Sequence, residues 1–341
     1  MNHTPPGTAG ASPAVTSQKT AGEAPAVPGR EEVSVCIVTF NSAADLPGCL
    51  ESVASLPVTV VDCASTDDTV AVARRYSERA VQVVELTENR GFAGGMNEAI
   101  ARTSAPFVLT LNADARLAPD FVSRLLARMD QPKVGAVTGR LVRPDGRLDA
   151  CGMRLTSSWR HLDRGSGEVD RGQLSSPERV FGATGAATLF RREALEDAAV
   201  EGEVFDSRFH SFREDAELAF RLRERGWEIL YEPAAICEHR RFNLPERRSA
   251  MPPMVNYHSL KNRYLLRIYH QTAGNLLRTL IPTAFRDLQA LGYVLLREHT
   301  SLPAYSWLWR NRRELTRRRR IIQGRKTTEV ERWFRVQGMP L

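Results

Sequence analysis

The chain has 341 residues, of which 42% are hydrophobic and 26% charged, and its formal net charge is +7. This composition is typical of a soluble globular protein with one or two domains. No apolar run approaches the roughly 20 residues needed to cross a bilayer, which excludes a membrane-spanning helix. The five cysteines form no CxxC pair, so a disulfide framework or a zinc site is disfavoured and reduced thiols in a cytoplasmic protein are expected.

Composition divides the chain into three predicted parts. Residues 1–30 are rich in Pro, Ala, Gly, Thr and Ser without a central apolar block, so we expect a disordered leader and not a secretory signal. Residues 31–243 have the pattern of a folded α/β domain. Residues 244–341 form a basic helical region, because residues 240–341 hold 21 Lys and Arg against 6 Asp and Glu.

The first part of the domain alternates short apolar runs with helical patterns. Buried strands are predicted at residues 33–39, 57–62, 81–86 and 107–114, with helices of about ten residues between them. Such alternation indicates right-handed βαβ units and a mostly parallel sheet flanked by helices.

A glycine-rich turn at residues 89–97 leads into the third helix. The turn lacks the GxGxxG spacing, and the chain has no GxxxxGK[ST] motif, so a dehydrogenase or a P-loop enzyme is disfavoured. Gly94 and Gly95 also fit a simpler role, close packing of the helix on the sheet.

Acidic residues follow the strands where ligands usually bind. Asp62 and Asp114 end two predicted strands, and Glu214 with Asp215 begin a later helix. With His239 these side chains could converge on one crevice that suits a divalent metal, Mg²⁺ or Mn²⁺, and a diphosphate.

Each of these residues also has a structural interpretation. Asp62 and Asp114 could cap helices, and Glu214 could act only on a helix dipole. His239, which stands beside charged neighbours, could be a surface residue.

The same segments resemble the successive motifs of family-2 inverting glycosyltransferases of the GT-A fold. The motifs occur in the family's order over residues 33–241 and continue more weakly at KNRYLL (261–266). They are VCIVTFN (35–41), VDCASTDDT (61–69), NRGFAGGMN (89–97), LNAD (111–114) and REDAEL (213–218). Within the family, the likeness is greatest to bacterial rhamnosyltransferase-like members that build surface polysaccharides.

The resemblance implies a role for each matching residue. Asp114 matches the last acid of the family's DxD metal motif, His239 the later histidine that can join the metal, and Asp215, paired with Glu214, the catalytic base. Asn112 stands where many members have the first Asp of that motif, and we place it near the donor. The other residues implied to surround the nucleotide-sugar are Thr39, Asn41, Asp62, Asn89, Arg90, Gly91 and Asn97.

The resemblance further implies a GT-A (nucleotide-diphospho-sugar transferase) fold with a nucleotide-binding part at 31–115 and an acceptor part at 116–243. The implied activity is inverting transfer from dTDP-rhamnose or a UDP-sugar to a hydroxyl of a saccharide or polyprenyl-linked acceptor, in cell-surface polysaccharide synthesis. A nucleotidyltransferase and a non-catalytic sugar-nucleotide-binding scaffold are the alternatives.

The basic C-terminal region has two interpretations. Amphipathic helical patterns at residues 257–269 and 275–297 suit a helix lying on an anionic membrane surface, on the cytoplasmic side of the plasma membrane. They equally suit a solvated basic face on helices that pack against the catalytic domain. Nucleic acid is not an expected partner, since no nucleic-acid-binding motif accompanies the charge. A homodimer is left open.

Overall fold

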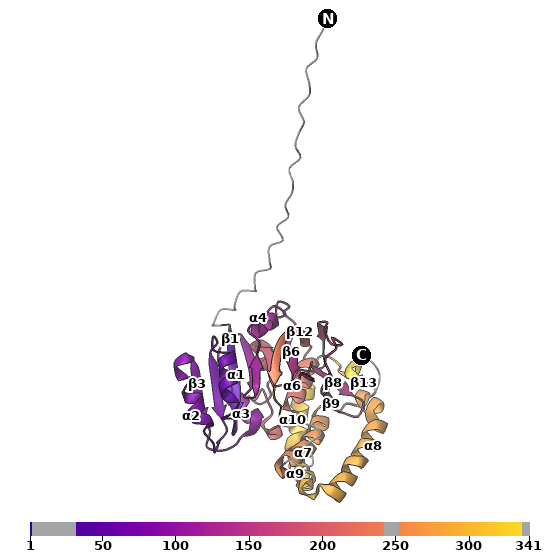
Figure 1. Ribbon diagram of the computed structural model, residues 1–341. Helices are drawn as coiled ribbons and strands as arrows, with labels where there is room; N and C mark the ends of the chain where they lie inside the picture. Colours follow the sequence, from indigo (N-terminus) through magenta and orange to yellow (C-terminus); the bar gives the residue numbers. More distant parts are fainter. Residues whose placement is uncertain (2–31, 242–251, 336–341) are drawn as a thin grey trace.

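The computed structural model describes residue 1, residues 32–241 and residues 252–335. Apart from residue 1, the leader expected at residues 1–30 lies outside the described residues. The described residues form a central mixed sheet with helices on both faces, and a group of C-terminal helices lies against one end of it (Figure 1).

The first half of the sheet is parallel and follows the prediction. Its strands are rich in Val and Ile, and almost all side chains of the first, second and fourth are buried, as expected for strands covered on both faces. They pair in the order β4-β1-β2-β3. The strands are β1 (Val33–Thr39), β2 (Val58–Asp62), β3 (Val81–Glu85) and β4 (Phe107–Asn112).

The second half of the sheet is mixed. The strand β11 (Ala187–Arg191) pairs antiparallel with both β4 and β6 (Val134–Val142). The long strand β12 (Glu228–His239) pairs parallel with β6. Short strands extend this half: β5 (Ala115–Leu117), β7 (Leu148–Ala150) and β10 (Glu178–Arg179).

Two layers of helices cover the sheet, each with its own apolar core. Apolar side chains of α1, α2 and α4 pack on one face, and those of α3, α5 and α6 on the other. The helices are α1 (Leu46–Ser52), α2 (Thr69–Arg74), α3 (Gly91–Ala101), α4 (Phe121–Leu126), α5 (Arg192–Ala198) and α6 (Glu214–Glu224). Short 3₁₀ turns are η1 (Ser77–Arg79) and η2 (Ser207–Phe209).

The C-terminal helices lie against the α6 side of the domain (Figure 1). They are α7 (Pro253–His270), α8 (Ala273–Arg297), α9 (Pro303–Arg310) and α10 (Arg312–Gly324), with η4 (His299–Ser301) and η5 (Glu331–Trp333). The last strand, β13 (Phe334–Arg335), joins β8 (Met153–Thr156) and β9 (His161–Asp163) in a small second sheet. In the described part of the chain, the helices are too short or too polar to cross a bilayer.

Candidate active site

A cleft of about 450 Å³ lies at one edge of the central sheet. The strands β1, β4 and β12 end at this edge, and β11 begins there because it runs antiparallel to β4. In open α/β sheets, ligands bind where the strands reach their carboxyl ends. Seven of the residues singled out in the sequence line the cleft: Thr39, Asn41, Asn89, Gly91, Asn112, Asp114 and His239.

Asp114 and His239 meet in the cleft although 125 positions of sequence separate them. His239 Nε2 lies 3.3 Å from Asp114 Oδ1 and 3.3 Å from Asn112 Nδ2. Pairing of β5 with β12 brings them together, since His239 aligns with Ala115, the residue after Asp114. The other ring nitrogen, Nδ1, lies 2.7 Å from Asp149 Oδ2.

The environment of His239 is strongly acidic. Burial alone lowers the pKa of His239, but hydrogen bonds and charge from Asp114 and Asp149 raise it to about 9. Asp149 is buried, and although burial raises its pKa, the net shift is downward because His239 and Arg241 stabilise the carboxylate. Arg241 also pairs with Asp163 at 2.7 Å.

The donor set fits a divalent cation that takes few ligands from the protein. Within the described residues no cluster of three or more His, Cys, Asp and Glu side chains could hold a metal alone. Asp114 and His239 instead offer one carboxylate oxygen and one imidazole nitrogen facing an open cleft. A metal would have to displace the Nε2 proton that Asp114 stabilises; with Nδ1 donating to Asp149, the freed lone pair of Nε2 would then be directed at the metal, as in carboxylate–histidine–metal arrangements. Phosphate oxygens and water would complete the coordination.

Asp62 lies behind the cleft wall and is not among the lining residues. Its carboxylate accepts hydrogen bonds from Thr39 Oγ1 at 2.8 Å and from the backbone N–H of Ser65 at 2.8 Å. Asn41 has a positive φ of 52°, and its side-chain oxygen accepts from Thr66 N at 2.8 Å. Asp62 therefore orients the ends of β1 and β2, and Thr39 and Asn41 face the cleft.

Some residues of the glycine-rich turn line the cleft, and others hold neighbouring segments in place. Asn89 and Gly91 line the cleft, and the Asn89 side chain accepts from Gly91 N at 2.8 Å. Arg90 is half-exposed and pairs with Glu88 at 3.2 Å. Asn97 exchanges two hydrogen bonds with the backbone of Phe205, at 2.7 and 2.9 Å, so it ties α3 to the segment before η2.

The acidic pair at the start of α6 adjoins the cleft. Asp215 accepts hydrogen bonds from the backbone N–H groups of Gly185 at 3.2 Å and Ala216 at 2.7 Å, and Thr184, next to Gly185, lines the cleft. Burial and the nearby charge of Asp163 raise the pKa of Asp215 to about 6. Burial and the charge of Asp215 raise the pKa of Glu214 well above its usual value. Both carboxyl groups are therefore shifted toward the protonated form by burial and by the charge of a neighbouring carboxylate.

A strained loop connects η2 to this acidic pair. His210, Phe212 and Arg213 all have positive φ, of 62°, 72° and 73°, a conformation that is costly for residues with a Cβ. Asn262 of α7 holds the loop, since its side-chain nitrogen lies 2.7 to 2.9 Å from the backbone oxygens of Phe209, Ser211 and Phe212. Sequence reasoning noted Asn262 only as part of a weak motif and did not predict this contact.

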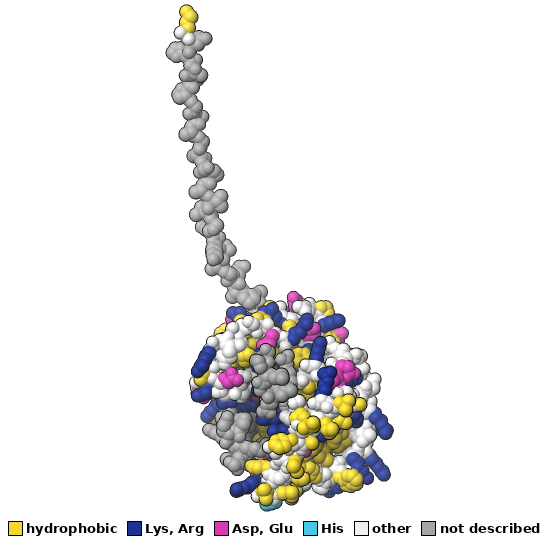
Figure 2. Space-filling view, turned by 90° about the vertical axis from the view of Figure 1, so that its right-hand side faces the viewer, with side chains coloured by type: hydrophobic (Ala, Val, Ile, Leu, Met, Phe, Trp, Pro, Cys, Tyr) yellow, Lys and Arg dark blue, Asp and Glu magenta, His cyan; other side chains and the backbone are white. Residues whose placement is uncertain are grey.

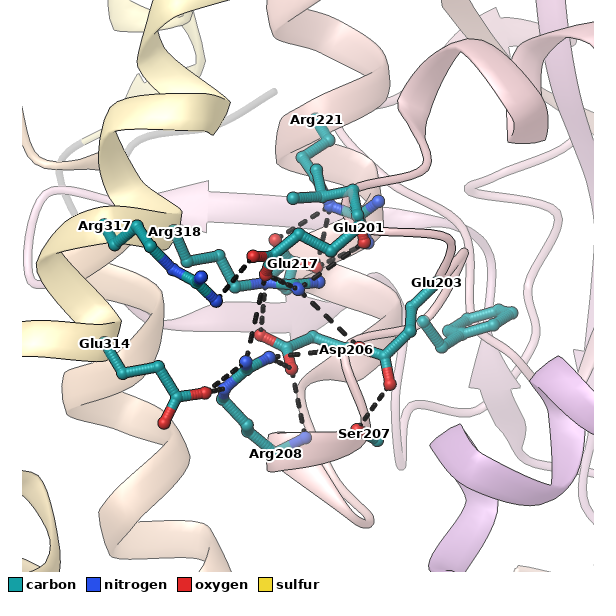
Figure 3. Close-up of polar contacts among 12 residues, drawn as sticks. Glu201, Glu203, Asp206, Ser207, Arg208, Glu217, Arg221, Glu314, Arg317 and Arg318 are labelled. Atoms are coloured by element: carbon teal, nitrogen blue, oxygen red, sulfur yellow. Dashed lines mark hydrogen bonds and ion pairs between the residues drawn. The ribbon is translucent and has the colours of Figure 1, made fainter. Parts of the chain in front are cut away.

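A buried ion network holds the other end of the same loop (Figure 3). Asp206, which precedes η2, accepts a hydrogen bond from Arg208 at 2.9 Å and pairs with Arg318 of α10 at 3.0 Å. Arg318 is fully buried and also contacts Glu201 at 3.1 Å. Two helices of the basic C-terminal region, α7 and α10, therefore hold a loop that lines the cleft.

Sequence reasoning missed three residues of the site. Asp149 orients His239, and Arg241 and His210 line the cleft. Asp149 stands between the apolar residues Leu148 and Ala150 in a short strand, and a carboxylate in such surroundings was the available signal. His210 carried none, because its place depends on the loop conformation.

The α/β fold with a cleft at the carboxyl ends of its strands is shared by proteins of known family, as comparisons show. Residues 34–198 match the family model described as Glycosyl transferase family 2. An N-acetylglucosaminyltransferase of Azorhizobium caulinodans is 29% identical over 227 residues, 63% of this chain and 56% of that protein. A poly-beta-1,6-N-acetyl-D-glucosamine synthase of Staphylococcus epidermidis is 27% identical over 214 residues, 61% of this chain and 49% of that protein. The chain spans about half the length of these curated relatives.

The solved structure of GalNAc-T7 with UDP, GalNAc and Mn²⁺ is similar with a TM-score of 0.55 and 13% identity, over 71% of this chain and 48% of that chain. At this identity the likeness shows the fold alone. The chain carries a family-2 glycosyltransferase domain of the GT-A fold. The family resemblance and the α/β fold class predicted from the sequence are confirmed.

Proposed function

We propose that the protein is an inverting glycosyltransferase that moves a sugar from a nucleoside-diphosphate donor to a hydroxyl of a saccharide or lipid-linked acceptor. The observation that carries the proposal is the cleft itself. It is lined by a metal-compatible pair, Asp114 and His239. Asp215, which accepts a hydrogen bond from Gly185 N between the lining residues Thr184 and Ala186, supports the proposal with a pKa that suits a base.

In the proposed reaction, the acceptor oxygen attacks the anomeric carbon of the donor from the face opposite the leaving group. A new C–O bond forms at this carbon, the bond to the diphosphate breaks, and the configuration inverts. Asp215 takes the acceptor's proton, and the nucleoside diphosphate leaves with the bonding electron pair. Because Asp215 has a pKa of about 6, it is ionised near neutral pH and still basic enough to accept a proton.

Asp114 and His239 would hold the divalent metal, Mg²⁺ or Mn²⁺. Bound there, the metal would supply positive charge for the diphosphate that the reaction releases. Asp149 keeps the His239 ring oriented, and Arg241 adds a fixed positive charge to the cleft wall. Asn112 contributes an amide next to His239 and needs no ligand role of its own.

The relatives support a UDP-sugar donor over dTDP-rhamnose. Both curated relatives are named for N-acetylglucosamine. One of them makes a polysaccharide, which supports a role in cell-surface polysaccharide synthesis and a saccharide or polyprenyl-linked acceptor. Rhamnosyl transfer remains the alternative that the sequence motifs suggest.

A donor panel separates this proposal from its rivals. The protein is incubated with UDP-N-acetylglucosamine, other UDP-sugars, GDP-mannose and dTDP-rhamnose, with Mn²⁺, with Mg²⁺ or with EDTA. Release of nucleoside diphosphate supports glycosyl transfer. In a parallel incubation with a sugar phosphate and a nucleoside triphosphate, release of pyrophosphate supports a nucleotidyltransferase. If no donor binds or reacts with any metal, the transferase proposal is wrong.

Two matched variants test the base. Asp215→Asn should lower turnover by about 10²- to 10⁴-fold while donor binding changes little, because only proton transfer is lost. Asp130→Asn removes an exposed acid of the same kind far from the cleft lining and should leave turnover unchanged. Equal turnover of Asp215→Asn and wild type would refute the base assignment.

A further inference from the structure

The amphipathic helix α8 buries mostly polar side chains and exposes its apolar ones. Its buried positions include the polar residues Asn275, Thr279 and Thr283, which face the rest of the protein. The Trp159 side chain donates to Thr279 Oγ1 at 3.1 Å, and Thr283 donates to the Ser157 carbonyl oxygen at 3.3 Å. A surface helix normally buries its apolar stripe. Here polar side chains fix the helix to the domain and leave the apolar stripe outside.

The exposed stripe runs the whole length of α8. Leu277 and Ile281 are 83% and 81% exposed, and Phe285, Leu288 and Leu296 are each at least 64% exposed. Figure 2 shows hydrophobic side chains gathered on the lower part of this face, with Lys and Arg side chains around them. Such a patch on a monomer marks an interaction site.

Exposed basic residues occur on α8 and on the two helices that follow it. Arg278 and Arg297 of α8 are exposed, as are Arg310, Arg312 and Arg313 of α9 and α10. A groove of about 810 Å³ opens between the start of α8 and these two helices, lined by Leu276, Trp309 and Arg312 among others. The Arg312 guanidinium lies over the Trp309 ring, 4.4 Å from its centroid, and Trp309 is 69% exposed. An amphipathic aromatic next to arginines is typical of the boundary between lipid tails and headgroups.

We propose that the exposed face of α8, with the arginines of α9 and α10, docks the protein on an anionic lipid bilayer. The helix would lie in the interface with its leucines among the upper acyl chains, while the arginines meet phosphate headgroups. A second copy of the chain is the competing occupant. The exposed apolar face is wider than a coiled-coil seam because Leu280 and Leu291 are also exposed beside the stripe, and the arginines of two copies would repel each other.

The inference rests on this surface and not on the proposed transferase activity, so the two can fail separately. If the acceptor is lipid-linked, the same docking would hold the protein at the membrane that carries its substrate, which deepens the proposed function.

The test uses the full chain and vesicles of equal parts phosphatidylglycerol and phosphatidylcholine, or of phosphatidylcholine alone. Wild type should sediment with anionic vesicles, bind neutral vesicles more weakly and be released by high salt. The triple variant Leu277→Gln, Ile281→Gln and Leu288→Gln should lower the partition coefficient about tenfold or more, because three exposed apolar side chains no longer enter the lipid. Val169→Gln changes an exposed apolar residue elsewhere and should bind like wild type.

Folding and self-association are measured on the same samples. The triple variant should keep the wild-type circular dichroism spectrum and thermal midpoint, because all three side chains are exposed. Equal vesicle binding by wild type and the triple variant would overturn the proposal. So would a wild-type dimer in light scattering that the triple variant converts to a monomer, without vesicle binding by either.

Discussion

The close approach of the donor-side turn to the η2 loop can be tested at Gly91. Gly91 has φ of +65°, and a Cβ built there would lie 2.4 Å from the backbone oxygen of His210 and 2.6 Å from its Cγ. This oxygen also accepts the hydrogen bond of Ala93 N at 3.0 Å, so it cannot withdraw without breaking that bond. Gly91→Ala therefore strains the backbone at position 91, because φ is positive there, and brings the new Cβ into collision with the His210 backbone, which cannot move away.

The two costs can be separated with a matched glycine. Gly146 has φ of +79°, and a Cβ built there would have no heavy atom within 4 Å. Gly146→Ala should carry only the left-handed strain, about 1–2 kcal/mol. Gly91→Ala should carry the same strain and about 1–3 kcal/mol more for overpacking, or about 2–5 kcal/mol in all.

Urea unfolding of both variants, followed by tryptophan fluorescence, gives the two losses of unfolding free energy. Equal slopes against urea are the condition for comparing them. Because the displaced loop leads to Asp215, Gly91→Ala should also lower turnover, whereas Gly146→Ala should not. If the two variants are equally stable, the contact between Gly91 and His210 does not constrain the loop, and the reasoning about the cleft wall is refuted.

Three further predictions concern charged and polar groups. Burial raises the pKa of Asp215 to about 6, so kcat/KM should fall as pH drops through 6 because the base becomes protonated; a flat profile from pH 5 to 8 would contradict it. Although burial acts in the opposite direction, Arg221 and His270 lower the pKa of Glu217 from 4.5 to about 2. Because the pKa of Glu217 is lower in the folded than in the unfolded state, its carboxylate adds about 3 kcal/mol at most to the free energy of unfolding above pH 4.5. This contribution is lost as the pH falls toward 2. The unfolding free energy of Glu217→Gln should therefore depend less on pH between 5 and 3 than that of wild type, and equal pH slopes would exclude the effect. Asn262→Leu removes the hydrogen-bond donor of three loop carbonyls, so it should lower kcat by a larger factor than it changes the KM for the nucleotide-sugar. An unchanged kcat would show that the loop keeps its conformation without Asn262.

Continuous apolar runs made the first half of the sheet predictable. The strands β1, β2 and β4 need Val, Ile and Leu on both faces, and few other structures accept such a run, so their bounds agree with the sequence prediction to within a residue or two. The convergence of Asp114 with His239 followed from the rule that ligands bind at strand ends. The antiparallel direction of β11 did not, because a buried strand has the same composition in either direction.

The supporting residues were unpredictable for a different reason. Asp62 and Asn97 belong to recognisable motifs, yet in the fold they bind backbone groups and Thr39 instead of facing the cleft. A motif records that a side chain is needed and does not record whether it contacts the ligand or holds a neighbour that does. Asp149 and Asn262 show the converse, since both act through other residues and neither belongs to a strong local pattern.

The basic C-terminal region shows why charge alone could not decide between packing and membrane contact. Arg318 of α10 is buried against Asp206, and Asn262 of α7 holds the strained loop, so these helices pack on the domain. The helix α8 turns its apolar side outward, and Asp287 on its other side pairs with Arg263 of α7 at 2.6 Å. The two interpretations therefore apply to different helices. Asn262 of α7 binds the loop beside the cleft, and α8 follows α7 in the chain. Removal of the whole C-terminal region would therefore disturb the active site as well as the membrane-facing surface. Only substitutions on the outer face of α8 test membrane contact without changing the active site.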